Sequence, residues 1–474
     1  MARLGNILRQ LREEKGLSLA DAASKIGFTD TRLLSLETKD KCSVKDLCSL
    51  ATLYDKSVLS ILDEADMLNQ YDQKMIRSFV PEFGQLSDEH KEQIQKQIGS
   101  LKESERDVCT FRLGELFCGP GGLACGAMNA RSKDGRFSVT HSWANDFDLD
   151  TCKTYTRNIC PDNPESVICE DVRELDLNRL PQEIDGFAFG FPCNDFSVVG
   201  EQKGINGTYG PLYQYGVNVL KKMQPKWFIA ENVSGLSSAN EGETFNRILG
   251  DLQKVGYVIT PHLYRFEDYG IPQTRHRIII VGIRKDITDV QFHVPSPEVI
   301  PQELRYQTAR EAIETPPIPA DASNNERTRQ SKQVVERLNC IKPGENAFTA
   351  DLPEHLKLKI KGARISQIYK RLDPDKPAYT VTGSGGGGTH IYHWEEPRAL
   401  TNRERARLQT FPDTFIFEGS KESVRKQIGM AVPCRGAQII VEAVLNSFAG
   451  CEYPSVNPNI KFDPIAEFEN ERQD

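Results

Sequence analysis

The stretch IDGFAFGFPCNDFS, residues 184–197, joins an apolar run to a reactive side chain. Its first half is a short apolar segment bounded by turn residues, which is typical of a buried strand. Pro192 cannot donate a ladder hydrogen bond, so it ends the strand and places Cys193 at the strand's carboxyl end. In open α/β sheets that end faces the ligand crevice. A lone free cysteine is more often a core residue, so other stretches must decide between packing and chemistry.

Length and composition limit the class of protein. A chain of 474 residues predicts two or three domains, and 38% hydrophobic with 27% charged residues is typical of a soluble globular protein. No apolar run reaches the ~20 residues that span a bilayer, and the charged N-terminus lacks the apolar core of a signal peptide. Twelve cysteines without CxxC or Cys/His zinc spacing predict reduced thiols, no metal site and a cytoplasmic location. The net charge of −8 does not indicate nucleic-acid binding, although a local basic stripe can supply phosphate contacts.

Residues 1–66 have the pattern of a small helical module. Gly16 ends a first helix with apolar residues at helical spacing, Ser18 can cap a second, and Thr29 or Asp30 can cap a third. The stretch LRQLREEKGLSLADAASKIGFTDTRLLSLE resembles the phage-repressor class of helix-turn-helix domains.

That resemblance implies a five-helix domain whose third helix enters the major groove of DNA. Thr29, Thr31 and Arg32 would lie at the end of the helix that meets the DNA. The alternative is a helical protein-interaction module, and such a module is also a candidate surface for forming a homodimer. Residues 67–108 follow as a polar connector, with one helix predicted over residues 85–105.

Polar and glycine-rich segments follow several other predicted strands. A turn with Gly119, Gly121 and Gly122 would let a nucleotide-like ligand approach the backbone, although many such turns are only tight turns. An acidic residue after the second strand commonly holds ribose hydroxyls. The pattern alone does not separate these functions from polar capping of strand ends, or from structural ion pairs. The strand ends concerned are Asn145–Asp148, Glu170–Asp171, Glu231–Asn232 and the run Gln273, Arg275 and Arg277.

Taken together, these stretches resemble the C5-cytosine DNA methyltransferase family from Phe111 to Gly450. The ordered motifs are FCGPGG, NDFD, GFPCNDFS, ENV, QTRHR, RLDPDKPAYTVTGS with RALTNRERARLQTFPD, and QIGMAV. The family implies S-adenosylmethionine as methyl donor and a mixed, mainly parallel seven-stranded α/β sheet flanked by helices. By this resemblance the catalytic domain covers 109–290 and is completed by 421–450. A target-recognition domain covers 291–420, and 451–474 is a tail.

The resemblance also assigns roles. Carbon 5 of cytosine is a poor nucleophile, so the Cys193 thiolate would first add at carbon 6 of a cytosine flipped out of double-stranded DNA. Glu231 would engage the ring nitrogen and exocyclic amine, Arg275 would orient Glu231, and Arg277 would contact the base. The loop 198–210 would fill the vacated stack. The cofactor contacts would be Phe117, Gly119, Gly121, Gly122, Leu123, Asp146, Phe147, Asp171 and Pro192.

Two positions depart from the family pattern. Asn194 follows the nucleophile where a glutamine is usual, and it keeps the amide. Met430 stands where an asparagine is usual, so one contact of the cofactor pocket is expected to be lost or supplied by the backbone.

The recognition region is short and basic. Its run LKLKIKGARISQIYKR contains six cations and no acid, which is either a solvated face or a stripe that contacts DNA phosphates. The glycine run 383–390 is either a linker or a loop close to DNA, and His390 and His393 lack further metal ligands nearby. The predicted DNA contacts here are Lys357, Lys359, Lys361, Arg364, Lys370 and Arg371.

The chain is therefore predicted to be a DNA cytosine-5 methyltransferase of the restriction-modification type. A cognate restriction endonuclease is the expected genetic partner, and the front module suggests repression of a promoter. Two alternatives remain at this point: a transcription regulator with an inactive methyltransferase half, and a methyltransferase that acts on transfer RNA.

Overall fold

The computed structural model describes residues 3–38, 44–54, 56, 61, 109–191, 212–236, 243–358, 366–383 and 386–462. The predicted helix over 85–105 lies outside these residues. Contacts divide the chain into two compact units, Met1–Lys102 and Glu103–Asp474, and each is described by itself.

The N-terminal unit is helical where the sequence predicts helices. Its described helices are α1 (Arg3–Glu14), α2 (Leu19–Lys25), α3 (Asp30–Thr38) and α4 (Val44–Tyr54). The Ser18 hydroxyl accepts a hydrogen bond from the Asp21 N–H, which confirms the predicted cap of α2. A buried ion pair joins α1 to α3, with Arg12 Nε 2.6 Å from Glu37 Oε1 and Nη2 2.9 Å from Oε2. Both charges are buried and bidentate, so they lock the angle between the two helices.

The second unit is built on a mixed seven-stranded sheet of order β3-β2-β1-β4-β5-β8-β6, which confirms the predicted fold class. Strands β1 to β5 pair with one another in parallel, and β8 runs antiparallel between β5 and β6. The parallel strands therefore end at one edge, which is where the sequence places its polar residues. The strands are β1 (Cys109–Leu116), β2 (Phe137–Asp146), β3 (Val167–Cys169), β4 (Gly186–Phe189), β5 (Trp227–Val233), β6 (Tyr257–Arg265) and β8 (His276–Arg284).

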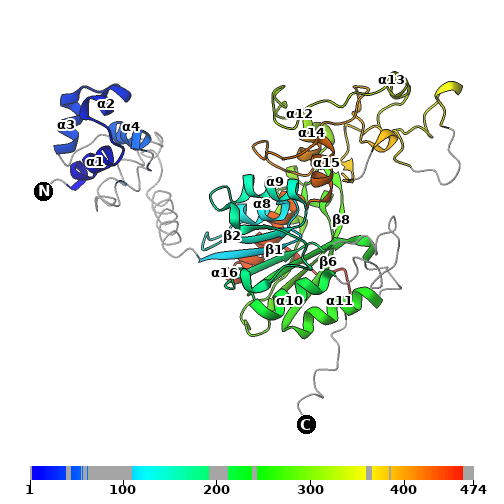
Figure 1. The fold of residues 1–474 in the computed structure, drawn as a ribbon, viewed down its shortest axis with the longest axis horizontal. Coiled ribbons are helices and arrows are strands. Elements are labelled where there is room, and N and C mark those ends of the chain that lie inside the picture. Colours follow the sequence, from blue (N-terminus) through cyan, green and yellow to red (C-terminus); the bar gives the residue numbers. More distant parts are fainter. Residues whose placement is uncertain are drawn as a thin grey trace, which may run out of the picture. The chain divides into compact units, whose positions relative to one another are not determined.

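Helices cover both faces of this sheet (Figure 1). Strand β5 shows why, because its residues alternate between two apolar clusters: Trp227 and Ile229 pack toward α16, while Phe228 and Ala230 pack toward α10 and α11. The helices of this layer are α8 (Gly122–Asn129), α9 (Leu149–Ile159), α10 (Tyr213–Met223), α11 (Glu243–Lys254) and α16 (Cys434–Ala449).

The segment from about residue 291 to 420 contains little regular structure. Its α-helices are α12 (Ala309–Glu314), α13 (Lys332–Asn339) and α14 (Asn402–Leu408), and α15 (Lys421–Met430) leads back to the sheet. Two-residue pairings join β7 (Gln273–Thr274) to β10 (Ala378–Tyr379) and β9 (Val294–Pro295) to β11 (Ser455–Val456). Short 3-10 turns lie at Pro164–Ser166, Leu177–Arg179, Phe266–Tyr269, Pro297–Val299, Gln302–Leu304, Glu354–Leu356 and Gly387–Thr389.

The C-terminal helices return to the catalytic layer as the sequence predicts, but as two helices, because Pro433 separates α15 from α16. The helical stretch Lys421–Ala449 is the one place in the described chain that is long and apolar enough to cross a membrane. Of its apolar window, 72% is buried inside the fold, so it has the character of a core helix.

Candidate active site

The glycine turn after β1 has the strained backbone that close ligand approach requires. Phe117 has a φ of 54°, and Gly119 and Gly121 have φ values of 55° and 95°. A side chain at the two glycines would be strained by these angles. A Cβ on Gly122 would lie 2.3 Å from the Val432 carbonyl oxygen, so the start of α8 packs directly on the chain that follows α15.

Acidic residues follow two of the neighbouring strands, and one of them contacts this turn. Asp146 at the end of β2 accepts hydrogen bonds from the N–H groups of Gly119, at 3.0 Å, and Asp148, at 3.1 Å. Burial raises the pKa of Asp146 despite those bonds. Asp171, after β3, instead pairs with Arg173 at 2.5 Å, which lowers its pKa to about 2 and keeps it ionised.

The arrangement fits the predicted cofactor. Phe147, next to Asp146, leaves 67% of its surface exposed, which is unusual for a phenyl ring and provides a face on which an adenine can stack. The Lys426 ammonium lies 5.9 Å from the ring centre. Open backbone at the glycine turn, a carboxylate for ribose hydroxyls and an exposed ring are the groups that S-adenosylmethionine needs. Pro192 lies outside the described residues.

The carboxylate Glu231 lies beside the strand that leads to Cys193. Asn232, the next residue on β5, donates a hydrogen bond of 3.1 Å from Nδ2 to the Phe191 carbonyl. A Cβ on Gly190 would be 3.3 Å from Glu231 Oε2. Cys193 itself lies outside the described residues. Cys193, the predicted nucleophile, follows Phe191 by two residues, and Phe191 is bonded to the residue after Glu231.

The ion-pair partner that the structure gives Glu231 is Arg277, whereas the resemblance predicts that Arg275 orients this carboxylate. Arg277 Nε lies 2.9 Å from Glu231 Oε1, because the antiparallel register of β8 on β5 sets the two residues side by side. Their side chains are 15% and 13% exposed, so water screens the pair only weakly.

Arg275 is fully buried and holds backbone instead. Its guanidinium donates to the carbonyls of Val381, Gly429 and Ala431 at 2.9–3.2 Å. Because Ala431 adjoins Val432, which packs on Gly122, Arg275 holds the chain that lies against the glycine turn. It lies between β7 and β8, outside the ladder that aligns Arg277 with Glu231.

Sequence reasoning singled out Gln273 but missed Gln409, the glutamine that bonds to it. The buried Gln273 amide donates to Leu408 O at 2.7 Å and to Gln409 Oε1 at 2.8 Å. Gln409 in turn donates to the carbonyls of Ile428 and Ala431. Two amides therefore join the QTRHR and RARLQ motifs. Gln409 can be seen in the RARLQ motif, but its hydrogen bond to Gln273 cannot be read from the sequence.

Comparison with known proteins identifies the family of this chain. The sequence profile of the C-5 cytosine-specific DNA methylase family matches residues 111–446. The chain belongs to this family. It is a DNA (cytosine-5-)-methyltransferase of the restriction-modification class and uses S-adenosylmethionine as methyl donor.

Several relatives of this methylase are similar over most of their length. The Type II methyltransferase M.BbvI of Brevibacillus brevis is 61% identical, over 75% of this chain and 96% of its own. M.NgoFVII of Neisseria gonorrhoeae is 38% identical over 75% of this chain and 91% of its own. M.Sau96I of Staphylococcus aureus is 27% identical, but its match covers 93% of this chain and therefore reaches into the N-terminal unit.

A solved structure supports the fold. A prophage-encoded protein of Escherichia coli, assigned as a DNA modification methyltransferase, matches with a TM-score of 0.52 and 24% identity. The match covers 72% of this chain and 99% of that chain.

One predicted DNA contact of the methylase is corrected by the structure. Arg371 is only 5% exposed, and its guanidinium donates to four backbone carbonyls, including His393 O at 2.8 Å and Leu338 O at 2.9 Å. Burial lowers its pKa. Arg371 therefore holds the recognition segment together, and a basic run was a poor guide to which of its cations face outward.

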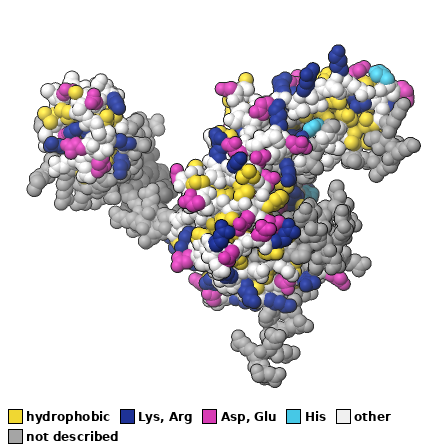
Figure 2. Space-filling view, in the orientation of Figure 1, with side chains coloured by type: hydrophobic (Ala, Val, Ile, Leu, Met, Phe, Trp, Pro, Cys, Tyr) yellow, Lys and Arg dark blue, Asp and Glu magenta, His cyan; other side chains and the backbone are white. Residues whose placement is uncertain are grey.

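The other predicted DNA contacts that the structure describes are exposed or half-buried. Lys357 is exposed and pairs with Glu354 at 2.7 Å, and Lys370 lies half-buried with Nζ 5.1 Å from the Tyr379 ring centre. In the N-terminal unit Thr29 and Thr31 are exposed, and Arg32 pairs with Asp46 at 2.7 Å. Figure 2 shows basic and acidic side chains interleaved on one face. Lys359, Lys361 and Arg364 lie outside the described residues.

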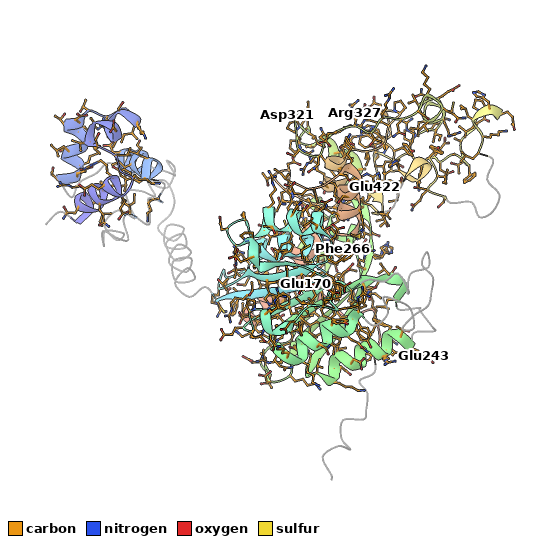
Figure 3. All side chains as sticks on the ribbon, viewed as in Figure 1. Glu170, Glu243, Phe266, Asp321, Arg327 and Glu422 are labelled. Atoms are coloured by element: carbon orange, nitrogen blue, oxygen red, sulfur yellow. The ribbon has the colours of Figure 1, made fainter. Side chains whose placement is uncertain are left out.

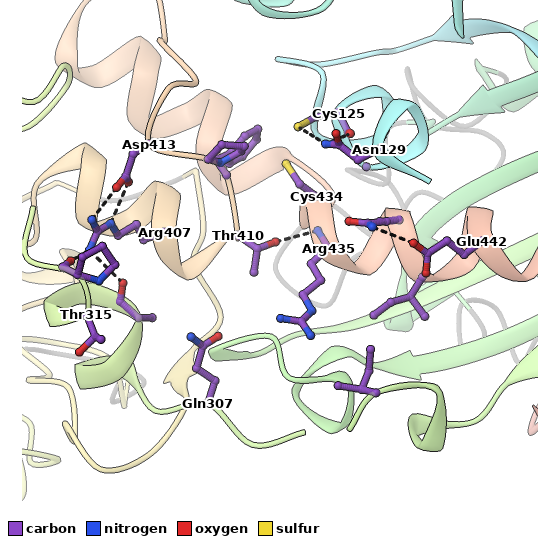
Figure 4. A pocket seen from close by; sticks show the side chains of 18 residues that line it. Cys125, Asn129, Gln307, Thr315, Arg407, Thr410, Asp413, Cys434, Arg435 and Glu442 are labelled. Atoms are coloured by element: carbon purple, nitrogen blue, oxygen red, sulfur yellow. Dashed lines mark hydrogen bonds and ion pairs between the residues drawn. The ribbon is translucent and has the colours of Figure 1, made fainter. Parts of the chain in front are cut away.

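A cavity of about 580 Å³ lies between α8, α12, α14 and α16, and it contains none of the predicted catalytic residues. Figure 4 shows Cys125 and Cys434 close together at one side and the Arg407–Asp413 ion pair at the other. The cavity therefore lies between helices of the sheet layer, α8 and α16, and helices of the recognition segment, α12 and α14. In the described chain no group of three His, Cys, Asp or Glu is placed to hold a metal.

Proposed function

We propose that Cys193, Glu231 and Arg277 carry the methylation chemistry. The observation that supports this most is the Glu231–Arg277 pair at 2.9 Å, next to the chain that enters the nucleophile's segment. The cofactor supplies the methyl group. Glu231 engages the ring nitrogen and exocyclic amine of the flipped cytosine, and Arg277 fixes the orientation of that carboxylate before the base arrives.

The protein's own groups account for the remaining steps. Cys193 adds to carbon 6 as a thiolate, which makes carbon 5 nucleophilic, and leaves after carbon 5 loses its proton. Asp146, Phe147 and the glycine turn position the donor, and Arg275 acts on this site indirectly, by bracing the wall of that turn. Asp171 is ionised by its contact with Arg173 and is available as a hydrogen-bond acceptor.

Bisulfite sequencing of host DNA tests the assignment. Cells would express the wild type, Cys193→Ala, or Cys109→Ala as a matched control, since Cys109 is an exposed cysteine at the start of β1. We expect methylcytosine in one short motif with the wild type and the control, and none with Cys193→Ala. Methylation by Cys193→Ala would refute the nucleophile. Competition between duplex DNA and transfer RNA for the same enzyme would separate the two substrate classes.

The biological setting is also a proposal. A cytoplasmic methylase similar to M.BbvI and M.NgoFVII, both Type II methyltransferases, would protect host DNA from a cognate endonuclease. The test is digestion: DNA from expressing cells should resist a nuclease that cuts at the methylated motif. If that DNA is cut as readily as DNA from cells without the protein, protection is excluded.

For the N-terminal unit we propose promoter binding, with dimerisation as the means of reading two half-sites. The exposed Thr29 and Thr31 at the start of α3, and the locked α1–α3 angle, support a presented helix. Footprinting on the DNA upstream of the gene tests this. Protection confined to methylation motifs would exclude a separate operator and favour the protein-interaction alternative.

A further inference from the structure

The cavity between α8, α16, α12 and α14 has the size and position of a ligand site. Its volume of about 580 Å³ falls within the range of roughly 300–1,000 Å³ that small-molecule pockets occupy. Its walls come from the sheet layer on one side and from the recognition segment on the other, and ligands often bind at such junctions. Neither Glu231 nor any residue of the glycine turn lines it. A molecule bound here would therefore be separate from the methyl donor and the cytosine.

Four charged side chains line the cavity, and three of them are bonded within its walls. The Arg407 guanidinium binds the Asp413 carboxylate through two nitrogens, at 2.9 and 2.6 Å, and donates to the Ile313 carbonyl at 2.9 Å. The Glu442 carboxyl accepts a hydrogen bond of 2.8 Å from the Gln438 amide, and burial raises its pKa. The Arg407 and Asp413 charges therefore cancel, and Glu442 is held by a neighbouring amide.

The fourth charge, Arg435 in the first turn of α16, is not engaged in this way. Its side chain is half-buried, and no hydrogen bond or ion pair joins the guanidinium to a residue that the structure describes. Glu442 lies seven residues further along α16, about 10 Å along the helix axis. The start of a helix carries partial positive charge, so a cation placed there favours the binding of an anion. The cavity therefore contains a guanidinium whose donors are available to a ligand.

The fold fixes the position of this arginine. The Arg435 N–H donates to the Thr410 hydroxyl at 2.9 Å, and Thr410 has a left-handed backbone with a φ of 59°. A β-branched residue adopts that conformation only where its surroundings impose it, and such residues gather at ligand sites. The next residue of α16 packs on the core, since a Cβ on Gly436 would lie 2.6 Å from the Phe266 ring (Figure 3). The Arg435 side chain instead extends toward the cavity (Figure 4).

A second polar group with unused donors lies opposite Arg435. Gln307 precedes α12 and is half-buried, and within the described ranges its amide makes no hydrogen bond. Figure 4 shows this amide and the Arg435 guanidinium pointing toward one another. A primary amide adds two N–H donors to the five of a guanidinium. Donors therefore converge on one part of the cavity from the sheet layer and from the recognition segment.

Apolar side chains lie beside this pair of donors. Ile439 follows Arg435 by one helical turn and therefore lies on the same face of α16. It is 5% exposed, and Ile300, which lines the cavity from the recognition segment, is 7% exposed. A ligand that uses the donors and these apolar walls together has an anionic group and an apolar body.

We propose that the cavity binds a small organic oxyanion, a carboxylate or a phosphate monoester, whose anionic group is held by Arg435 and Gln307. A guanidinium fork matches both of these oxyanions, because each presents two oxygens to two parallel N–H groups. The apolar part of the ligand lies against Ile439 and Ile300. Because the ligand contacts the sheet layer and the recognition segment at once, it stabilises the folded unit and raises its unfolding temperature.

Three ring compounds of similar size test this proposal: benzoate, phenyl phosphate and the neutral benzamide. Each is added to the full-length protein without DNA or S-adenosylmethionine, and sodium chloride matches the ionic strength. Thermal unfolding is followed by tryptophan fluorescence, because every tryptophan of the chain lies in the second unit. The variants are Arg435→Met and Gln307→Leu. Arg329→Met is the matched control, because Arg329 is an exposed arginine that does not line the cavity.

We expect an oxyanion at about 10 mM to raise the unfolding temperature of the wild type and of Arg329→Met by about 2 °C, the shift for a Kd of about 1 mM. Arg435→Met should bind at least about tenfold more weakly and show almost no shift, because a charge-assisted contact is lost. Gln307→Leu should lose part of the shift. Benzamide should shift none of the proteins. Without ligand, Arg435→Met should be as stable as the wild type, since its guanidinium has no described bond to lose.

The two oxyanions separate the two ligand chemistries. A shift with benzoate alone assigns the site to carboxylates, and a shift with phenyl phosphate alone assigns it to phosphate monoesters. The proposal is overturned if the oxyanions stabilise Arg435→Met and Gln307→Leu as much as the wild type, because they then bind elsewhere. It is equally overturned if neither oxyanion stabilises the wild type, or if benzamide acts as strongly as benzoate. If Arg435→Met does not fold, Gln307→Leu against the wild type decides the outcome.

Discussion

Glu115 gives the methylase a pH-dependent stability that one substitution should remove. This carboxyl lies on β1, is 2% exposed, and accepts a hydrogen bond of 2.7 Å from the Tyr155 hydroxyl. Burial raises its pKa from 4.5 to about 8. The folded protein therefore retains a proton near neutral pH that the unfolded chain has released.

The sign follows from proton counting. Because the folded-state pKa is the higher one, the stabilisation from this proton is fully present below pH 4.5. It is lost progressively as the pH rises toward 8. The slope is about 1.4 kcal/mol per pH unit near pH 6.5 and about half that at pH 8, so the loss across this window is about 2 kcal/mol in all. Buried histidines with pKa values lowered to about 4 oppose this slope up to and somewhat above pH 6.5, so Glu115 is isolated by comparing the wild type with Glu115→Gln, in which the histidine contribution cancels. The buried histidines are His141, His262, His390 and His393.

The assay is urea unfolding of the wild type and Glu115→Gln at pH 6.5, 7.25 and 8. The three tryptophans of the chain, Trp143, Trp227 and Trp394, all lie in the second unit, so their fluorescence reports on that unit alone. Glutamine keeps an acceptor for Tyr155 and cannot ionise. We expect the difference in unfolding free energy between the two proteins to shift by about 2 kcal/mol toward the variant across the window. Parallel curves would refute the assignment of a buried proton to Glu115.

Three further substitutions test the site. Arg277→Gln leaves Glu231 without its partner and should lower kcat/KM by at least about tenfold, since breaking a weakly screened pair costs more than about 1.4 kcal/mol; methyl transfer at the wild-type rate would contradict it. Gly122→Ala drives a Cβ into the Val432 carbonyl, and an overpacking cost of about 1–3 kcal/mol should appear as weaker cofactor binding in calorimetry; unchanged affinity would show that α8 can move freely. Arg371→Gln should lower the unfolding temperature and leave the salt dependence of DNA binding unchanged, because the Arg371 guanidinium binds backbone carbonyls. If the variant were as stable as the wild type and its slope of log K against log salt fell by one phosphate, Arg371 would be a DNA contact after all.

The strand ends were predictable from the sequence because the information is local. Short apolar runs followed by glycine, proline or acidic residues identify buried parallel strands and their carboxyl edge, and the structure places Glu231 and Asp146 at that edge. The Ser18 cap is local as well, since a hydroxyl and an N–H three residues later suffice.

Partner choice among the arginines was not predictable, because it depends on register and on contacts far apart in the chain. Arg275 and Arg277 are two residues apart in one motif, yet the antiparallel pairing of β8 with β5 sets Arg277 directly beside Glu231. Arg275 lies outside that ladder and meets carbonyls more than a hundred residues away.

The sequence by itself determined the family, the order of the strands' functional ends and the chemistry that Cys193 is expected to perform, because each depends on short motifs in a known order. Only the tertiary structure decided which cations of the recognition segment bind backbone carbonyls. In helix α14 Arg403 donates to three carbonyls, and among the described residues no such bond is made by the Arg405 side chain. The two are indistinguishable as letters of RERAR, because the difference lies in which distant backbone carbonyls the fold brings within reach of each guanidinium.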